Sequence, residues 1–516
     1  MSAHDPGRRS LVLGAAAAAA AAAMPVMTRA EVPGPAVPAK DDSADLPLLD
    51  LSAVEAVARI ARGELTAERY AAALLARCHS QRSLNAFITL DPERVLEDAR
   101  ARDQQRHAGA ALGPLFGLPI PVKDSVNTSD YRTTGGTPAL RDFRPAKDAP
   151  VVAALRAAGA VILGKTNLHE LSFGWTSNNQ AFGAVHNPYD PACVPGGSSG
   201  GTAAAIAARM APLGVAEDTE GSIRVPAAFC GITGFRPTTG RYSTRACVPI
   251  SPLFDQVGPH ARTMADVALF DAAVTGDRRP LARASLRGVR LGVVRDFWYS
   301  DLDPEVERIS AAALERLQAA GAILIESPLP GVAKLIDLIT DQVQNHDVRS
   351  ALAGYLEEYG AGITLEQLVA RASPDIQATF RSDVLPGGAN FVSEAEYAAA
   401  RDQHLPALRA LYREYFARTG VAAMVFPAVR VAAPRIGEET TVAIRGRPIA
   451  FEAAVARNIA PGSTAGLPGL VLPAGLTAAG LPVALEFDAP AGADRALLAL
   501  GTACEHALGP IPGPAR

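Results

Sequence analysis

Three short segments carry residues that could perform nucleophilic chemistry. Gly117-Leu-Pro-Ile-Pro-Val-Lys123-Asp124 places a lysine at the end of an apolar run, and Gly196-Gly-Ser-Ser-Gly-Gly201 is a glycine–serine loop. Asp218-Thr-Glu-Gly-Ser222-Ile-Arg224-Val-Pro226 is a second turn that carries a serine. A serine hydroxyl needs a base to become a strong nucleophile. None of the nine histidines lies in a telling context, whereas a buried lysine can be neutral and basic.

Each segment alone has a simpler interpretation. The glycine–serine loop also fits an anion-binding turn, because the small-residue run 202–210 after it favours a helix. A lysine such as Lys123 is usually a surface residue, although the apolar run before it indicates a buried strand. Ser222 by itself carries no signal. The combination of the three segments is what indicates catalysis.

Two other motif matches fail on their mechanism. The stretch 159–166 fits the phosphate-binding pattern G-x-x-x-x-G-K-T, but its four intervening residues are Ala-Val-Ile-Leu, which favour a strand over a flexible loop. The stretch 196–200 fits G-x-S-x-G, the nucleophile elbow of α/β-hydrolases. That elbow requires a hydrophobic strand before the serine, and residues 187–195 contain three prolines.

The order of the three segments resembles the amidase signature family. Further stretches that resemble family elements are Gly164-Lys-Thr-Asn167, Ser177-Asn-Asn179, Phe182-Gly183, Gly234-Phe-Arg-Pro-Thr238 and Pro461-Gly-Ser-Thr-Ala-Gly-Leu-Pro-Gly469. The resemblance covers nearly the whole chain after residue 45 and is most specific between residues 117 and 262. Within the family, the chain resembles indoleacetamide and mandelamide hydrolases most.

This resemblance implies a Ser–cis-Ser–Lys triad and no metal or other cofactor. By motif, Ser222 is the nucleophile, Ser198 is the bridging serine and Lys123 is the base. The backbone N–H groups of Thr219, Glu220, Gly221 and Ser222 would form the oxyanion hole. Supporting roles are expected for Ser199, Asp218 and Arg224. A substrate pocket is expected near Phe173, Trp175 and Thr176.

The chain departs from the family pattern at two positions. The family commonly reads G-T-D-x-G-G-S where this chain reads Ala216-Glu-Asp-Thr-Glu-Gly-Ser222. Glu217 therefore replaces a threonine, and Glu220 places a carboxyl group beside the oxyanion turn. Pairing of Glu220 with Arg224 or Arg241, attraction of a cationic substrate, and exposure to solvent are the open interpretations.

Alternating strands and helices predict an α/β fold, and the resemblance implies one large mixed sheet sandwiched between helices. Ser52-x-x-Glu55 is a capping box, and the helix after it would bury Val54, Val57 and Ile60. A second helix from Thr66 would bury Tyr70, Leu74 and Cys78. Expected strands are 85–90, 160–163, 289–294 and 322–325, and expected helices are 150–158 and 304–320.

Residues 1–30 read as a twin-arginine export signal. Arg8 and Arg9 precede a short apolar run from Leu11 to Ala23, and Thr28-Arg29-Ala30 fits a cleavage site. The apolar run is shorter than the roughly 20 residues of a membrane-spanning helix. Residues 31–46 would be a linker, residues 47–512 the amidase domain, and the location periplasmic or secreted.

Composition excludes several functions. The net charge is −4, and the sequence lacks the clustered basic residues of a nucleic-acid-binding face. Five scattered cysteines indicate neither a disulfide framework nor a zinc site.

The expected activity is hydrolysis of a small aryl or arylalkyl carboxamide to a carboxylate plus ammonia or an amine, by an acyl-enzyme. The alternatives are a carbamate or anilide hydrolase, an inactive binding protein and a tRNA transamidase subunit. No stable membrane insertion is expected, and a homodimer is left open.

Overall fold

The computed structural model describes residues 46–282 and 285–515. Its central feature is one mixed sheet of eleven strands, ordered β1-β3-β2-β6-β8-β7-β14-β15-β11-β9-β10. The bounds of these strands are β1 Phe87–Leu90, β2 Pro119–Lys123, β3 Val161–Thr166, β6 Leu213–Asp218, β7 Thr233–Arg236, β8 Gln256–Ala261, β9 Arg290–Val293, β10 Ile323–Glu326, β11 Ala423–Pro427, β14 Gly469–Leu476 and β15 Pro482–Asp488. Two short hairpins lie outside the sheet, β4 (Asn178–Asn179) with β5 (Gly183–Ala184) and β12 (Thr441–Ile444) with β13 (Arg447–Ala450).

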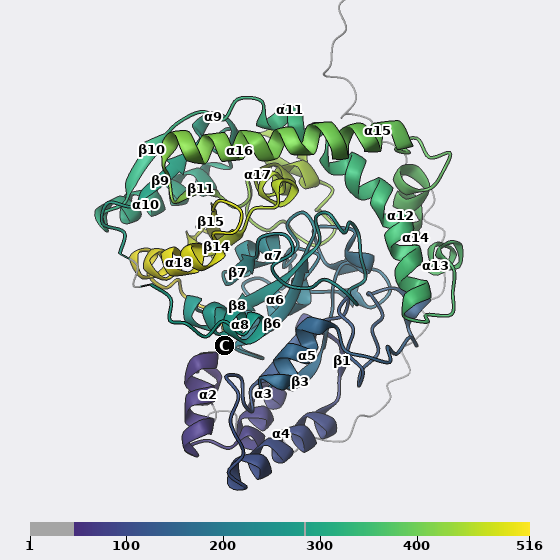
Figure 1. Cartoon of the computed structure of the whole chain (residues 1–516), viewed down its shortest axis with the longest axis vertical. Helices are drawn as coiled ribbons and strands as arrows, with labels where there is room; N and C mark the ends of the chain where they lie inside the picture. Colours follow the sequence, from purple (N-terminus) through teal and green to yellow (C-terminus); the bar gives the residue numbers. More distant parts are fainter. Residues whose placement is uncertain (1–45, 283–284, 516) are drawn as a thin grey trace, which may run out of the picture. The chain divides into compact units, whose positions relative to one another are not determined.

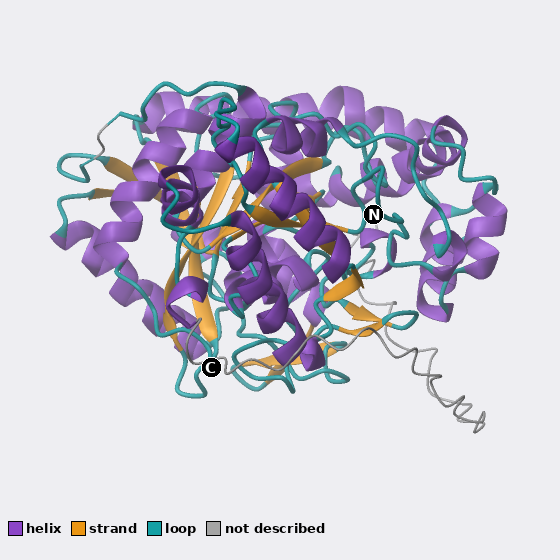
Figure 2. Ribbon diagram, turned by 90° about the horizontal axis from the view of Figure 1, so that it is seen from below, coloured by secondary structure: helices purple, strands orange, loops and turns teal. Residues whose placement is uncertain are grey.

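Helices lie on both sides of the sheet, as expected for the α/β fold (Figure 2). The α-helices are α1 Leu46–Leu49, α2 Ala53–Arg62, α3 Ala67–Ser80, α4 Pro92–His107, α5 Pro150–Ala157, α6 Gly200–Ala207, α7 Arg224–Phe229, α8 Met264–Thr275, α9 Arg295–Trp298, α10 Pro304–Ala319, α11 Val332–Asp337, α12 Thr340–Glu358, α13 Leu365–Arg371, α14 Pro374–Thr379, α15 Glu394–Ala399, α16 Leu405–Thr419, α17 Phe451–Ala465 and α18 Asp494–Leu508. The helices α6 and α7 pack together beside the central strands, and α8 packs against α18 (Figure 1).

The predicted elements are present with small shifts at their ends. The side chain of Ser52 caps α2 in a complete capping box with Glu55, and Thr66 caps α3. Tyr70, Leu74 and Cys78 are buried as predicted. The prediction for the buried face of α2 was wrong at Val54, which is 40% exposed. That helix buries Ala53, Ala56 and Ile60, because the small alanines allow closer packing against α8.

The structure confirms that the phosphate-binding pattern and the nucleophile-elbow pattern do not form their usual structures. The segment that imitates a phosphate loop is the fully buried strand β3. The segment before the glycine–serine loop contains turns and one isolated bridge at Cys193, and is no central strand. Neither a phosphate loop nor a nucleophile elbow is therefore built at these positions.

Parallel pairing brings the chemistry-bearing segments to one edge of the sheet. The strand β2 lies between β3 and β6 and is parallel to both, with Val122 opposite Val215. The carboxyl ends of parallel strands point the same way, so Lys123 at the end of β2 lies beside Glu217 and Asp218 at the end of β6. The turn with Ser222 continues directly from β6.

The predicted export signal, residues 1–30, lies outside the described residues, as does nearly all of the predicted linker. The described chain begins with α1 at Leu46, one residue before the predicted start of the domain. Within the described residues, no helix is both long and apolar enough to cross a membrane.

Candidate active site

Lys123 and Ser198 are in direct contact in the buried interior. The Nζ atom of Lys123 donates a hydrogen bond to Ser198 Oγ at 2.7 Å, and both side chains are 0% exposed. Because β2 ends at Lys123, its side chain emerges from the sheet edge toward the glycine–serine loop. The peptide bond between Gly197 and Ser198 is cis.

The glycine–serine loop packs against another loop more tightly than a side chain would permit. A Cβ atom on Gly197 would lie 2.6 Å from the Thr176 backbone nitrogen, and such a contact forces movement of the backbone. The hydroxyl of Ser199 donates to the backbone carbonyl of Glu217 at 3.0 Å. The Ser199 N–H donates to the Ser222 carbonyl at 3.3 Å, so this loop and the Ser222 turn are joined one residue from Ser198.

The Ser222 turn is held by a buried ion pair. Arg224 Nε lies 3.1 Å from Asp218 Oδ2, and the same oxygen accepts from the Ile223 N–H at 3.0 Å. Burial acts to raise the pKa of Asp218, but the guanidinium groups of Arg224 and Arg236 hold it below its usual value. The carboxylate is therefore charged and fixes the turn from both sides.

The carbonyl groups of this turn are committed to interior donors. Arg224 Nη2 donates to the Glu220 carbonyl at 3.2 Å, and the Arg224 N–H donates to the Gly221 carbonyl at 2.8 Å. In a trans peptide the N–H points opposite to the C=O. The N–H groups of Gly221 and Ser222 consequently point to the other side of the turn. Ser222 itself is 6% exposed.

Glu217 makes a contact that the sequence did not predict. Its Oε2 atom lies 2.8 Å from Lys123 Nζ, and the side chains of both residues are essentially inaccessible to solvent. The alternation of side chains along β6 indicates the face of the sheet on which Glu217 lies. Only the pairing of β2 with β6 shows that Glu217 contacts Lys123. Glu217 thus adds a carboxyl group to the Lys123–Ser198 pair.

Glu220 does not pair with either predicted arginine through its side chain. Arg224 binds the backbone carbonyl of Glu220, and Arg241 pairs with Asp271 at 2.8 Å. The side chain is partly buried, and burial raises the pKa of Glu220 well above its usual value, with Asp341 and Glu452 adding to the effect. The interpretation that Glu220 pairs with Arg224 or Arg241 is therefore wrong.

Aromatic side chains lie close to the Ser222 turn. The Trp175 ring reaches Gly221, where its Cζ3 atom would be 2.9 Å from an added Cβ atom. Phe173 packs on Phe380 with ring centroids 5.1 Å apart, in a cluster formed mainly by residues of α12–α14. Thr176 hydrogen-bonds His169 at 3.2 Å and is 7% exposed. Of the three predicted pocket residues, Trp175 is the one placed beside the turn.

The nearby histidines are unsuited to replace the lysine. Burial lowers the pKa of both His169 and His260 to about 4, so both rings are neutral but weak bases at physiological pH. His260 Nε2 lies 2.6 Å from the Ile223 carbonyl, which requires the ring to donate there. The ring of His260 is therefore committed to supporting the backbone beside Ser222.

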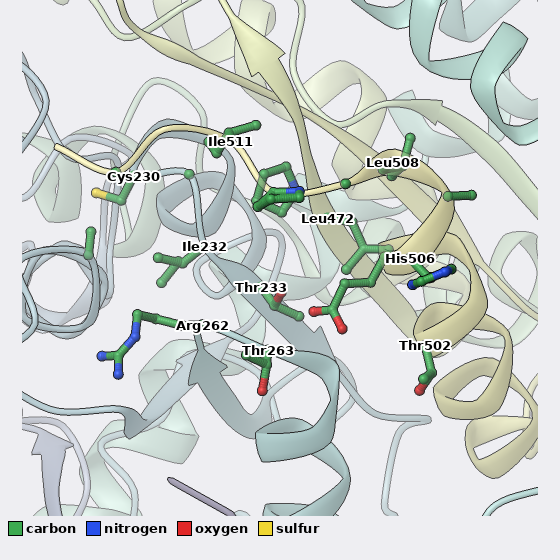
Figure 3. A pocket seen from close by; sticks show the side chains of 18 of the residues that line it. Cys230, Ile232, Thr233, Arg262, Thr263, Leu472, Thr502, His506, Leu508 and Ile511 are labelled. Carbon is green, nitrogen blue, oxygen red and sulfur yellow. The ribbon is translucent and has the colours of Figure 1, made fainter. Parts of the chain in front are cut away.

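A large cavity lies elsewhere in the molecule. It has a volume of about 830 Å³ and is lined by Cys230, Thr233, Arg262, Leu472 and the C-terminal segment 508–514, among others (Figure 3). Among its lining residues, Cys230 to Thr233 follow the end of α7, whereas Ser222 precedes that helix. The cavity contains none of Lys123, Ser198 or Ser222.

Metal-binding groups are not found in the described part of the chain. No cluster of three or more His, Cys, Asp or Glu residues there could hold an ion. The five cysteines are all buried and free. Burial raises the pKa of each thiol for which a shift is resolved, including Cys193 to about 11, so these groups are poor nucleophiles.

Comparison with known proteins defines the family. Residues 69–498 match the family model described as Amidase. The chain is 36% identical to the indoleacetamide hydrolase of Agrobacterium vitis over 458 residues, covering 89% of this chain and 97% of that enzyme. It is 35% identical to the mandelamide hydrolase of Pseudomonas putida over 486 residues, covering 91% and 94%. The chain therefore belongs to the amidase family and is an amidase.

Solved structures agree with this assignment. A crystal structure of an amidase matches with a TM-score of 0.78 at 30% identity, covering 89% of this chain and all of the other. The peptide amidase from Stenotrophomonas maltophilia matches with a TM-score of 0.75 at 28% identity, covering 91% and 99%. The mixed sheet with flanking helices is thus the fold of these amidases.

Proposed function

We propose that the enzyme hydrolyses a small aryl or arylalkyl carboxamide through an acyl-enzyme on Ser222. The observation that carries the proposal is the 2.7 Å hydrogen bond between Lys123 and Ser198, beside the turn that presents Ser222. Lys123 is the base and Ser198 relays the proton, because a hydroxyl both donates and accepts.

The steps balance as follows. Ser222 Oγ attacks the amide carbon while its proton passes to Ser198 Oγ and the Ser198 proton passes to Lys123 Nζ. The tetrahedral intermediate collapses, the C–N bond breaks, and the proton returns along the same path to the leaving nitrogen. Water then attacks the acyl carbon and passes a proton through Ser198 to Lys123, the bond from the acyl carbon to Ser222 Oγ breaks, and that proton returns to Ser222 Oγ. The released acid ionises to the carboxylate. The N–H groups of Gly221 and Ser222 stabilise the oxyanion, joined by those of Thr219 and Glu220.

The aryl preference is proposed from the surroundings of the turn. Trp175 lies against Gly221, and an indole ring offers a large apolar surface to an aromatic acyl group. Two relatives are named for hydrolysis of indoleacetamide and mandelamide, both arylalkyl amides. We extend that substrate class to this chain. Phe173 and Thr176 complete the proposed pocket.

A fluorophosphonate probe and a substrate panel test the proposal. The probe should label Ser222, and Ser222→Ala should abolish both labelling and release of ammonia from arylalkyl amides. Lys123→Arg should lower kcat/KM by about 10²–10⁴-fold, since a guanidinium stays protonated. Labelling that maps to Ser198 in Ser222→Ala would overturn the assignment. Faster turnover of carbamates or anilides than of amides would overturn the substrate class.

We also propose that residues 1–30 direct export by the twin-arginine route, as the Arg8-Arg9 pair and the following apolar run suggest. The mature enzyme would then act in the periplasm or outside the cell.

A further inference from the structure

Both oxygens of Glu217 are engaged by neighbours. The Oε2 atom contacts Lys123 Nζ at 2.8 Å and accepts a hydrogen bond from Ser172 Oγ at 3.2 Å. The Oε1 atom lies 3.1 Å from Thr219 Oγ1. With 2% of its surface exposed, Glu217 lies where a charge is tolerated only when it is paired. Lys123 provides that pairing.

Thr219 stands between two carboxyl groups. Its Oγ1 atom lies 3.1 Å from Glu217 Oε1 and 2.7 Å from Asp255 Oδ1. A hydroxyl has one hydrogen, so it can donate to one of these oxygens and not to both. The other contact requires a proton from a carboxyl group. Consistent with this, burial, reinforced by Glu217, raises the pKa of Asp255 to about 8.

Ser172, whose hydroxyl contacts Glu217, lies in a segment with an uncommon backbone conformation. Leu171 and Ser172 have φ values of 52° and 63°, which non-glycine residues rarely adopt and which cost free energy. Ser172 in this conformation donates its hydroxyl hydrogen bond to Glu217 Oε2 at 3.2 Å.

From this geometry we infer that Glu217 is a positioning residue that holds Lys123 against Ser198 and balances the charge that Lys123 gains, while Glu217 and Asp255 share one proton across Thr219. The inference rests on the proposed function, in which Lys123 accepts a proton from Ser198. The Glu217 carboxylate stabilises the ammonium that forms on Lys123 when Ser222 attacks, and so raises the rate of acylation and of labelling.

Other groups near Lys123 do not supply this effect. His169 and His260 are neutral, and burial raises the pKa of the Cys247 thiol so that it too is neutral. The nearby charged pairs are Lys165 with Asp124 at 3.1 Å and Asp218 with Arg224 and Arg236. Each of these carboxylates already faces a cation of its own. Glu217 is the carboxylate that contacts Lys123 itself.

The test is the pH dependence of Ser222 labelling by a fluorophosphonate, which needs no amide substrate. Glu217→Gln keeps the shape and removes the charge. We expect the acidic limb of the labelling rate to move to lower pH by about 1–3 units, the usual effect of a neighbouring opposite charge, and the plateau at high pH to fall. Glu217→Asp should retain a limb close to that of the wild type.

Glu170→Gln is the matched control, because Glu170 is also buried but contacts the Ser373 N–H instead of Lys123. Its limb should stay at the wild-type pH. Equal loss of labelling at every pH in Glu217→Gln, or a limb moved to higher pH, would overturn the inference. The expected shift in Glu217→Gln, together with a wild type that hydrolyses no amide, would overturn the proposed function alone. Amide turnover with an unmoved limb would overturn the inference alone.

Discussion

Asp218 and Arg224 form a completely buried ion pair at 3.1 Å across the turn that presents Ser222. The same guanidinium also contacts Glu486 on β15 and Ser463 on α17. The pair thus connects the candidate nucleophile to a strand and a helix more than 200 residues away in sequence. Its geometry predicts a shared dependence of stability and activity on these residues.

Asp218→Asn should therefore destabilise the fold and misplace Ser222. Removing one partner of a buried pair costs about 3–5 kcal/mol, because the other charge stays buried without compensation. Urea unfolding should show that loss, and Ser222 labelling should fall under conditions where the variant remains folded. Arg62→Ala, which breaks the exposed pair with Glu64, should leave both measurements unchanged. Equal stability of the two variants would refute the role of the Asp218–Arg224 pair in holding the Ser222 turn.

Asp255 should make stability depend on pH. Its pKa is raised from the ordinary value of an aspartate to about 8, so the folded state holds a proton that the unfolded chain releases. Its contribution is complete below about pH 4 and is lost as pH rises toward 8, with a slope of at most about 1.4 kcal/mol per pH unit. Asp255→Asn should flatten that slope in urea unfolding followed from pH 5 to 8. Parallel curves for the two proteins would contradict the shared proton.

Glu220 should affect catalysis at alkaline pH. Burial raises the pKa of the carboxyl group, which opposes the oxyanion only after it ionises. Glu220→Gln should match the wild type for a neutral aryl amide at acidic pH and exceed it increasingly as pH rises. For a cationic amide, ionised Glu220 should lower KM in the wild type. The same rate ratio for both amides at every pH would show that the side chain acts on neither.

Export can be tested independently of catalysis. Replacing Arg8 and Arg9 by lysine should retain the protein in the cytoplasm, since the pair is the distinctive feature of the signal. Cell fractionation with N-terminal sequencing measures location and cleavage together. Wild-type protein found in the cytoplasm with residues 1–30 intact would exclude the export signal.

The sequence predicted elements whose signals are local. Capping by Ser52 and Thr66 was predictable because each cap depends on residues within one helical turn. The helices between residues 332 and 419 were not predicted, although Thr364 and Ser393 begin complete capping boxes that could have revealed two of them. The helix α17 continues through Pro461, where a local rule would have ended it.

The candidate site likewise contains some residues that local motifs predict and others that only the fold brings together. Lys123, Ser198 and Ser222 were found by motif, and the structure places Lys123 against Ser198. The contact of Glu217 with Lys123 depends on which strands are neighbours and how far they extend, and the sequence alone does not state either. Of the open interpretations of Glu220, pairing with an arginine is wrong because Arg224 is engaged by Asp218 and Glu486, and Arg241 by Asp271.

The parallel pairing of β2 with β6 has a consequence for how the enzyme matures. Lys123 and Glu217 are 94 residues apart, so their contact forms only after a long loop closes and both strands enter the sheet. No short fragment of the chain can contain the complete constellation. Recovery of Ser222 reactivity after dilution from denaturant would therefore report the late assembly of the central sheet, and would lag behind the recovery of helical content.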